Sequence, residues 1–258
     1  MYTKNKYMNR LKSILMTGLL VFSTLTVSAQ DAKEIVRKSD TKYNGEKSSY
    51  SEMSMTIVRP KYKRTIEMKS WTEVAGNSLT LITAPAKEQG QSFLKNGNNL
   101  WSWNPTIQRL IKLPPSMMSQ GWMGSDFTND DILKESSFVK DYTHKIIGNE
   151  VIDGLKCYKI VLMPLQNSNV VWGKIIMWIS VNDYFQLKGE FYDEDEVLVK
   201  THLASKIAVF DDRQLPSLLE IIPADEPGNK TVVTVKKMKF NIKTDQNFFS
   251  QQNMKRLK

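Results

Sequence analysis

Few side chains in this sequence combine the type and the spacing that catalysis or metal binding requires. The two histidines, His144 and His202, fall in separate predicted strands, which is too sparse for a histidine metal site. The single cysteine, Cys157, lies in the apolar run LKCYKIVLM and is expected to be a buried, unreactive thiol. The motifs of serine hydrolases, zinc proteases, dithiol redox proteins and P-loop enzymes do not occur. The sequence therefore predicts no enzyme activity, no metal site and no cofactor.

Acidic clusters are the remaining candidates for chemistry. They are Asp130-Asp131, residues 193–196 and Asp211-Asp212. All of them fall in expected turns or helix starts, where carboxylates are favoured on structural grounds alone. A hydrolase with paired carboxylates is compatible with these residue types, but no spacing supports it.

Basic residues outnumber acidic ones, and the net charge is +9. Apart from a basic N-terminus they are spread along the chain in groups such as KYKR (61–64) and VKKMKF (235–240). Lysines on strands protect sheet edges from aggregation, which explains these groups adequately. Contact with an anionic membrane surface is the weaker alternative, and a nucleic-acid partner is not expected.

Methionine is the unusual residue, with ten copies after the first 16 positions. A methionine-rich core explains any single copy, but the group suits walls that re-pack around apolar ligands of variable shape. A loop rich in Met, Gly and Trp resembles a lid over such a site. The expected ligand-binding residues are Met53, Met55, Ile57, Ile66, Met68, Leu79, Leu81, Trp101 and Trp103, and the expected lid residues are Met117, Met118, Trp122, Met123 and Phe127.

The elements that must position these side chains are mostly strands. Residues 31–43 predict a helix that ends at Asn44-Gly45, and from Ser49 onward the apolar residues alternate with period two. Turn residues such as Pro60-Lys61 and Asn96-Gly97 separate about ten to eleven strands. Residues 114–131 break the alternation, a short helix is expected near Thr128, and residues 247–256 form a final helix or cap. The fold class is mainly β (α+β), with antiparallel strands closing or half-closing around a core and helices on the open side.

One strand is apolar on both faces. Ile175, Met177 and Ile179 alternate with Ile176 and Trp178. A strand with one solvent-exposed face is expected to carry polar residues on that face. Either helices cover both faces of the sheet, or one face lines an apolar cavity.

The N-terminus has the pattern of a secretory signal peptide. Four basic residues precede a short apolar stretch that ends in Val27-Ser28-Ala29. An uncleaved membrane anchor is the alternative, but the apolar stretch is short of the ~20 residues that a spanning helix needs. We therefore expect cleavage after Ala29, export to the periplasm, and a single domain over residues 30–258 with a net charge reduced to +5.

The mature sequence resembles the bacterial outer-membrane lipoprotein-sorting proteins. The resemblance is strongest over residues 90–133, where Gly124-Ser125-Asp126-Phe127 follows a Pro-Pro-Ser-Met-Met turn. Supporting stretches are residues 148–164, 173–195 and 240–256. The resemblance implies the LolA/LolB-like fold, an incomplete antiparallel barrel whose open side is plugged by helices over an apolar cavity. An arginine controls closure in those carriers, and Arg64 or Arg109 is proposed for that role here without a matching motif.

The resemblance also implies a function and partners. Such carriers bind acylated lipoproteins or lipids and deliver them from an inner-membrane exporter to an outer-membrane acceptor. The leading hypothesis is therefore a periplasmic carrier or chaperone that holds acyl chains in the cavity. The alternatives are a module that senses lipid or lipoprotein status and an accessory subunit of a membrane exporter, both on the same fold.

Overall fold

The strand pattern of the sequence produces one large sheet. The structure, a computed structural model, describes residues 31–73, 76–97, 99–133 and 137–257. The predicted signal peptide, residues 1–29, lies outside the described residues. Ala32–Lys258 form one unit of dense contacts. In the part of the chain that the structure describes, no helix is long and apolar enough to cross a membrane.

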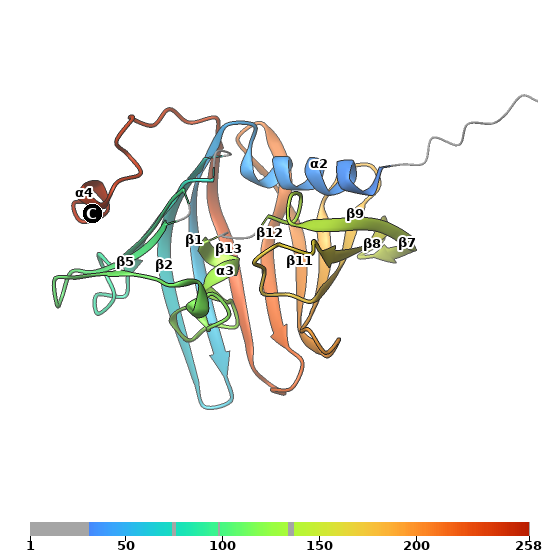
Figure 1. Cartoon of the computed structure of the whole chain (residues 1–258), viewed down its shortest axis with the longest axis horizontal. Coiled ribbons are helices and arrows are strands. Elements are labelled where there is room, and N and C mark those ends of the chain that lie inside the picture. Colours follow the sequence, from blue (N-terminus) through green and yellow to red (C-terminus); the bar gives the residue numbers. More distant parts are fainter. Residues whose placement is uncertain (1–30, 74–75, 98, 134–136, 258) are drawn as a thin grey trace, which may run out of the picture. The chain divides into compact units, whose positions relative to one another are not determined.

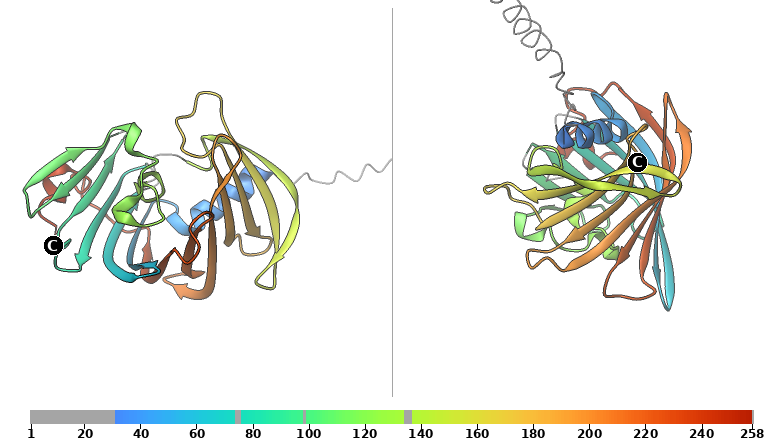
Figure 2. Two further views of the ribbon diagram at one scale, coloured as in Figure 1. Left: turned by 90° about the horizontal axis from the view of Figure 1, so that it is seen from below. Right: turned by 90° about the vertical axis from the view of Figure 1, so that its right-hand side faces the viewer.

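Thirteen strands form a single antiparallel sheet in the order β6-β5-β4-β3-β2-β1-β13-β12-β11-β10-β9-β8-β7. Strands adjacent in sequence pair with each other except for β6 and β7, and β1 also pairs with β13. The two edge strands, β6 and β7, are therefore consecutive in the chain and joined by residues 113–141. The sheet is curved and stays open between these two edges (Figure 1; Figure 2).

The strands differ in length, from four residues to thirteen. Their bounds are β1 Ser48–Arg59, β2 Tyr62–Glu73, β3 Ser78–Ala84, β4 Ser92–Asn96, β5 Asn99–Asn104, β6 Arg109–Lys112, β7 Tyr142–Ile152, β8 Leu155–Pro164, β9 Lys174–Ser180, β10 Gln186–Tyr192, β11 Leu198–Phe210, β12 Arg213–Pro223 and β13 Lys230–Phe240. The expected mainly β class is confirmed, but the expected ten to eleven strands were too few. The run from Gly173 to Asp193 folds into two strands, β9 and β10, because a turn at residues 181–183 interrupts it.

Helix α2 (Ala32–Asn44) lies where the sequence predicts a helix and packs against β7, β9 and β12 (Figure 2). Its apolar stripe buries Ile35 and Val36, each 2% exposed. Gly45 ends the helix, since its N–H donates to the Thr41 carbonyl at 2.8 Å and its φ is +76°. The position requires a glycine because other residues resist that left-handed conformation.

The segment that joins the two sheet edges is irregular, as the sequence predicts. It contains the short 3-10 helices η1 (Pro115–Met117) and η2 (Trp122–Gly124) and the helix α3 (Asn129–Leu133). Thr128 caps α3: the Asp131 N–H donates to the Thr128 hydroxyl, and the Thr128 N–H donates to the Asp131 carboxylate. The last helix, α4 (Gln251–Met254), is capped by Ser250. We call residues 114–133 the interior segment.

The concave face of the sheet carries two apolar clusters. The helix cluster packs Ile35 and Val36 of α2 against β7–β10, and the loop cluster packs the interior segment against β1–β5, β12 and β13. Val171 contacts both clusters. In Figure 2 the interior segment and α2 lie on the same side of the sheet. The hydrophobic interior of the protein is thus one continuous layer under two different covers.

Candidate functional site

The expected ligand-binding residues of the first hairpin share one buried face. Across the β1–β2 register, Met53 lies opposite Met68 and Met55 lies opposite Ile66. Met55, Ile66 and Ile57 are 0–1% exposed, and Met53 is partly buried against the same cluster. The period-two pattern thus places these five side chains together, as the sequence predicts.

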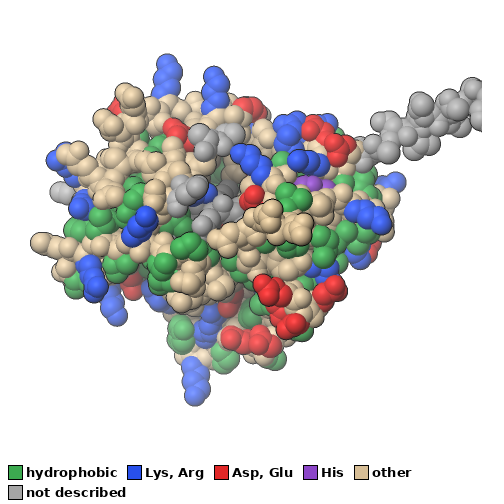
Figure 3. Space-filling view, in the orientation of Figure 1, with side chains coloured by type: hydrophobic (Ala, Val, Ile, Leu, Met, Phe, Trp, Pro, Cys, Tyr) green, Lys and Arg blue, Asp and Glu red, His purple; other side chains and the backbone are tan. Residues whose placement is uncertain are grey.

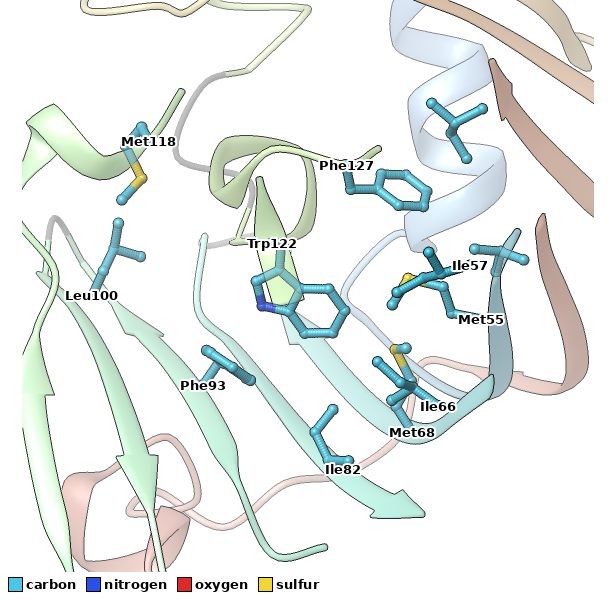
Figure 4. Close-up of a cluster of buried hydrophobic side chains, with 12 residues drawn as sticks. Met55, Ile57, Ile66, Met68, Ile82, Phe93, Leu100, Met118, Trp122 and Phe127 are labelled. Atoms are coloured by element: carbon cyan, nitrogen blue, oxygen red, sulfur yellow. The ribbon is translucent and has the colours of Figure 1, made fainter. Parts of the chain in front are cut away.

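The expected lid residues lie directly on that face. Met118, Trp122 and Phe127 are buried members of the loop cluster, and Met117 and Met123 pack against it. Figure 4 shows the Trp122 indole in the middle of the cluster, and its ring centre lies 5.2 Å from that of Phe93. The space that the sequence assigns to an apolar ligand is therefore filled by the lid itself.

Four of the expected ligand-binding residues lie elsewhere. Trp71 pairs with Leu79 across β2–β3, whereas Met68 pairs with Ile82, so Leu79 and Leu81 face the side opposite to Met68. Leu79, Trp101 and Trp103 belong to a tail cluster on the outer face, where Phe249 and Met254 of the C-terminal segment cover them. The expectation that these four side chains share a face with Met55 was wrong, because side chains one residue apart on a strand point to opposite faces.

Arg59, at the end of β1, holds the interior segment in place. Its guanidinium donates to both carboxylate oxygens of Asp126, at 3.0 and 3.1 Å, and to the Gly124 carbonyl at 3.1 Å. The Thr231 hydroxyl donates to the same carboxylate at 2.6 Å. The pair is largely shielded from solvent, since 15% of the Arg59 side chain and 7% of the Asp126 side chain are exposed. A bidentate, shielded pair of this kind is among the stronger polar contacts in proteins.

Of the two arginines proposed from the sequence, only Arg64 contacts the interior segment. It donates to the Met123 carbonyl at 3.2 Å and pairs with Glu88 at 3.0 Å. Arg109 is exposed at the edge strand β6. Arg59 was not among the predicted site residues, because the Gly-Ser-Asp-Phe signature indicates Asp126 but not the partner of its carboxylate.

A buried ion pair forms the second polar attachment. Lys200 on β11 pairs with Asp131 at the start of α3, and the two side chains are 3% and 6% exposed. Burial raises the pKa of the Asp131 carboxyl, but nearby charges, above all the Lys200 ammonium, lower it by more, so the pKa lies below its usual range. Asp131 is therefore an ionised carboxylate held inside the protein. The sequence analysis assigned it only to a helix start.

His202 lies two residues along β11 from Lys200 and faces the same interior. Its ring centre is 4.2 Å from that of Phe191 and 5.9 Å from that of Phe127. Burial lowers its pKa to about 3, and the positive charge of Lys200 acts in the same direction. The imidazole is therefore neutral at physiological pH. His202 lies in a strand, as the sequence predicts.

Several buried polar atoms lack a hydrogen-bond partner among the described residues. They include the indole N–H groups of Trp122 and Trp172, the Tyr142 hydroxyl and Nε2 of His202. Leaving a buried donor unpaired costs about 1–3 kcal/mol. These atoms concentrate where the loop cluster meets the helix cluster, so several buried polar groups at this boundary lack hydrogen bonds among the described residues.

Two hollows on the molecule lie away from the loop cluster. One, of about 390 Å³, is lined by Tyr50, Trp71 and four lysines, among them Lys237 and Lys239 of the VKKMKF run. The other, of about 460 Å³, lies beside α2 and Arg213. Over the face drawn in Figure 3, basic side chains stand apart from one another rather than forming one continuous patch.

Other expected features have clear positions. Cys157 is buried, and burial raises the pKa of its thiol. Within the described ranges, no three His, Cys, Asp or Glu side chains cluster as a metal site would require.

Strand β9 is buried on both faces, one in the helix cluster and one in an outer cluster with Cys157 and Phe185. That outer face is closed by its own side chains and by the stems of Lys159 and Lys188 over Trp178, which neither alternative from the sequence foresaw.

Comparison with known proteins places the fold. A family model described as an uncharacterized protein matches residues 75–256. No curated protein sequence matches the chain. Three solved structures match at TM-scores of 0.75 to 0.77, which confirms the resemblance to the lipoprotein-sorting proteins at the level of the fold.

The match to each of these structures spans nearly the whole length of the other chain. A domain described as an outer membrane lipoprotein-sorting protein, from Vibrio parahaemolyticus, is 22% identical with a TM-score of 0.76, covering 87% of this chain and 98% of that one. A DUF1329 family protein from Desulfovibrio piger is 21% identical with a TM-score of 0.77, covering 86% and 97%. A LolA superfamily protein from Nitrosomonas europaea is 24% identical with a TM-score of 0.75, covering 87% and 99%.

Proposed function

This chain belongs to the uncharacterized protein family whose model matches residues 75–256, and on that premise and its fold we propose that it is a periplasmic carrier or chaperone for acyl chains. It would bind the acyl chains of lipoproteins or lipids on the concave face and deliver them towards the outer membrane. An inner-membrane exporter and an outer-membrane acceptor are the corresponding partners. The proposal includes cleavage after Ala29, a single mature domain over residues 30–258, and no catalytic step.

The observation that carries the proposal is the way the loop cluster is filled. Met118, Trp122 and Phe127 come from the irregular connection between the two free edges of the sheet, not from a strand or a long helix. Moving that connection outward would break no strand pairing, since the sheet order is unaffected by it. The vacated face would present Met55 and Ile66 to an acyl chain in place of the lid.

Two features lower the stability of the closed interior segment. The Trp122 N–H is buried without an acceptor among the described residues. Met123 has φ +51°, a left-handed conformation that costs about 1–2 kcal/mol in a residue with a side chain. The attachment also depends on two ion pairs, Arg59–Asp126 and Lys200–Asp131. A cover with these properties is suited to exchange with a ligand.

The energy of such an exchange favours ligand uptake. Burying one methylene contributes ~0.8 kcal/mol, so an enclosed chain of about 15 methylenes gains roughly 12 kcal/mol before ordering costs. Displacing the lid exposes its own three large side chains, and the free energy of their burial must be subtracted from this gain. Release then requires an equally apolar acceptor, which fits delivery to a membrane protein better than dissociation into water.

A lock on the interior segment tests the proposal. Because the Thr231 hydroxyl lies 2.6 Å from the Asp126 carboxylate, the pair Asp126→Cys and Thr231→Cys is placed to form a disulfide. Mass spectrometry establishes that the bond has formed. The oxidised protein should not bind a fluorescent fatty acid, and reduction should restore binding. Equal binding in both states would show that the ligand does not enter under the interior segment.

Lipid content and transfer complete the test. The purified protein should carry lipid, detected by mass spectrometry of an organic extract, and should move a fluorescent lipid between vesicles. Lipid binding without transfer would favour the sensing module, and co-purification with an inner-membrane complex would favour the exporter accessory. Empty extracts together with no fatty-acid binding would overturn the proposal.

A further inference from the structure

The boundary between the two interior clusters contains more hydrogen-bond donors than acceptors. Lys200 is a permanent donor, the Trp172 indole N–H donates only, and the Tyr142 hydroxyl and one tautomer of His202 add two more. These side chains are 2–9% exposed. The Trp172 Nε1, the Tyr142 hydroxyl and His202 Nε2 have no hydrogen-bond partner among the described residues.

Three of these side chains, Trp172, His202 and Lys200, surround one aromatic ring, that of Phe191. The Trp172 ring centre lies 5.4 Å from the Phe191 ring centre, and the His202 ring centre lies 4.2 Å from it. The Lys200 ammonium is 5.5 Å from the same ring centre and 4.5 Å from that of Trp172. Tyr142 joins through Phe138, which lies 6.2 Å from Tyr142 and 6.3 Å from Phe191, centre to centre. The donors are therefore neighbours in one buried region.

Among the described residues, the negative group that pairs with Lys200 is supplied by the interior segment. Asp131 stands at the start of α3, within the part of the chain that also inserts Trp122 and Phe127 into the loop cluster. Phe127 contacts His202 at a ring distance of 5.9 Å. The interior segment thus presents apolar side chains followed by a carboxylate, which is the chemical order of an acyl chain followed by an anionic head group.

We propose that Lys200, Trp172, Tyr142 and His202 form an anchor for the anionic head group of an acyl ligand, and that Asp131 occupies this anchor when the interior segment is closed. The proposal rests on the proposed function, since it requires the segment to move. The oxygen atoms of the head group would accept from the Lys200 ammonium and from the donors that lack acceptors in the closed form. Displacing Asp131 would otherwise leave the Lys200 charge buried and unpaired, so the anchor would select ligands that carry a negative charge.

Paired probes with the same hydrocarbon chain test the anchor. A fluorescent fatty acid, its neutral methyl ester and the corresponding alkyl phosphate are titrated into the full chain at pH 7.5. We expect the acid and the phosphate to bind at least tenfold more tightly than the ester. If the acid alone is favoured, the anchor is specific for carboxylates. Equal affinity for all three probes would overturn the anchor while leaving the carrier proposal intact.

Two single substitutions should change the preference in opposite directions. Lys200→Met keeps the length of the side chain and removes its charge, so the acid should lose its advantage over the ester. Asp131→Asn keeps the shape and removes the competing charge, so the acid should bind several-fold more tightly while its advantage over the ester grows. An unchanged ratio of acid to ester affinity in both variants would contradict the anchor.

A matched control separates opening from anchoring. Asp126→Asn weakens the other attachment of the same segment and keeps the Asp126 backbone carbonyl to which Lys200 donates, so it should strengthen acid and ester binding by the same factor. Should Lys200→Met fail to fold, the double variant Lys200→Met with Asp131→Leu removes both charges and should bind the ester at least as well as the acid. If no probe binds any variant, including Asp126→Asn, the proposed function itself fails.

Discussion

Helix α2 and the interior segment cover two halves of the same concave face by different means. Helix α2 satisfies its own backbone, ends at a glycine that the turn requires, and buries Ile35 and Val36 under strands β7 and β9. The interior segment buries larger side chains, but its backbone is irregular and its hold depends on charged side chains at Asp126 and Asp131. Packing of α2 is supplemented by hydrogen bonds from Lys42 to the Asp183 carbonyl and from Lys38 to the Tyr184 hydroxyl. Packing of the interior segment is supplemented by two shielded ion pairs.

The polar contacts of the two covers also differ in their surroundings. The ion pair on α2, Arg37 with Glu34, lies on the exposed face of the helix and does not join the helix to the sheet. Arg59–Asp126 and Lys200–Asp131 are shielded and join the interior segment to β1 and β11. Breaking a shielded pair leaves a charge without its partner, so these contacts determine when the segment can leave. The comparison predicts that damage to α2 unfolds the protein and that damage to the interior segment opens it.

The largest expected effect follows from truncating the helix cover. Ile35→Ala removes a side chain that is 2% exposed and should lower the free energy of unfolding by about 2–5 kcal/mol. Urea denaturation followed by tryptophan fluorescence measures it. The exposed position Lys33 on the same helix provides the control, and Lys33→Ala should change stability by no more than about 0.5 kcal/mol.

The same truncation in the interior segment sharpens the comparison. Trp122→Ala should lower the free energy of unfolding by less than the ~3–5 kcal/mol typical of a buried tryptophan. The loss cannot exceed the free energy with which the interior segment docks on the sheet. Proteolysis within residues 114–133 should become faster instead. A loss in Trp122→Ala as large as that in Ile35→Ala, without faster cleavage, would make the two covers equivalent and break the comparison.

Removing one polar attachment should have the next largest effect. Asp126→Asn leaves Arg59 without its carboxylate and should weaken docking of the interior segment by about 1–3 kcal/mol. Hydrogen exchange of amides in residues 114–133 should accelerate, while amides of α2 and β9 keep their protection. Asp225→Asn, at an exposed turn residue, is the matched control and should leave both regions unchanged. Faster exchange in α2 as well would show that the covers open together.

The sequence predicts the strands of this fold well because each strand carries its own evidence. Alternation identifies Met55 and Ile66 as one face, and Pro60-Lys61 fixes the turn between them. The face cannot be extended to Leu79 from the pattern, because it is the pairing of Met68 with Ile82 that places Leu79 on the opposite face. Its cover, Phe249, comes from the far end of the chain. Local periodicity therefore determines a strand but not which side of the sheet becomes the interior.

The polar attachments were invisible to the same reasoning. Lys200 and Asp131 are 69 residues apart in the chain, and neither belongs to a motif. A signal existed, because Lys200 and His202 are two residues apart on one face of a predicted strand. Charged or titratable residues on an inward face indicate a buried partner, but the sequence alone does not say which carboxylate it is. The interior segment is therefore held by this pairing as well as by its apolar side chains.

Acid should open the interior segment through His202. Its pKa is about 3 in the folded protein and 6.5 when unperturbed, so the packed state resists a proton that an opened state accepts. The contribution of His202 to the free energy of unfolding is fully present above about pH 6.5. It is lost as the pH falls towards 3, by up to about 1.4 kcal/mol per pH unit. The lowered pKa of Asp131 acts in the same direction only below its ordinary value of 3.8.

A difference measurement isolates this histidine. The stability of the wild-type protein between pH 6.5 and 5 should fall more steeply than that of His202→Gln, measured by urea denaturation at each pH. The variant His144→Gln should keep the wild-type slope, since it leaves the interior histidine in place. Parallel pH profiles for wild type and His202→Gln would mean that the imidazole already accepts a proton in the closed state.

The smallest expected effect comes from two glycines with the same backbone conformation. Gly45 ends α2 with φ +76°, and Gly124 lies in the interior segment with φ +75°. A methyl group added at Gly45 would lie 2.8 Å from the Ser48 carbonyl oxygen, whereas one added at Gly124 would meet nothing within 4 Å. Gly124→Ala should therefore cost only the left-handed strain, about 1 kcal/mol, and only in docking of the segment.

Gly45→Ala adds a steric conflict with the backbone to the same strain, so it should cost more and should appear in the global unfolding transition. Comparing urea midpoints with proteolysis of residues 114–133 separates the two effects. Because both glycines carry the same conformational penalty, any difference between the variants reports the surroundings of the two covers. If Gly124→Ala lowered the global midpoint as much as Gly45→Ala, the interior segment would be as integral to the folded protein as α2, and exchange with a ligand would require partial unfolding.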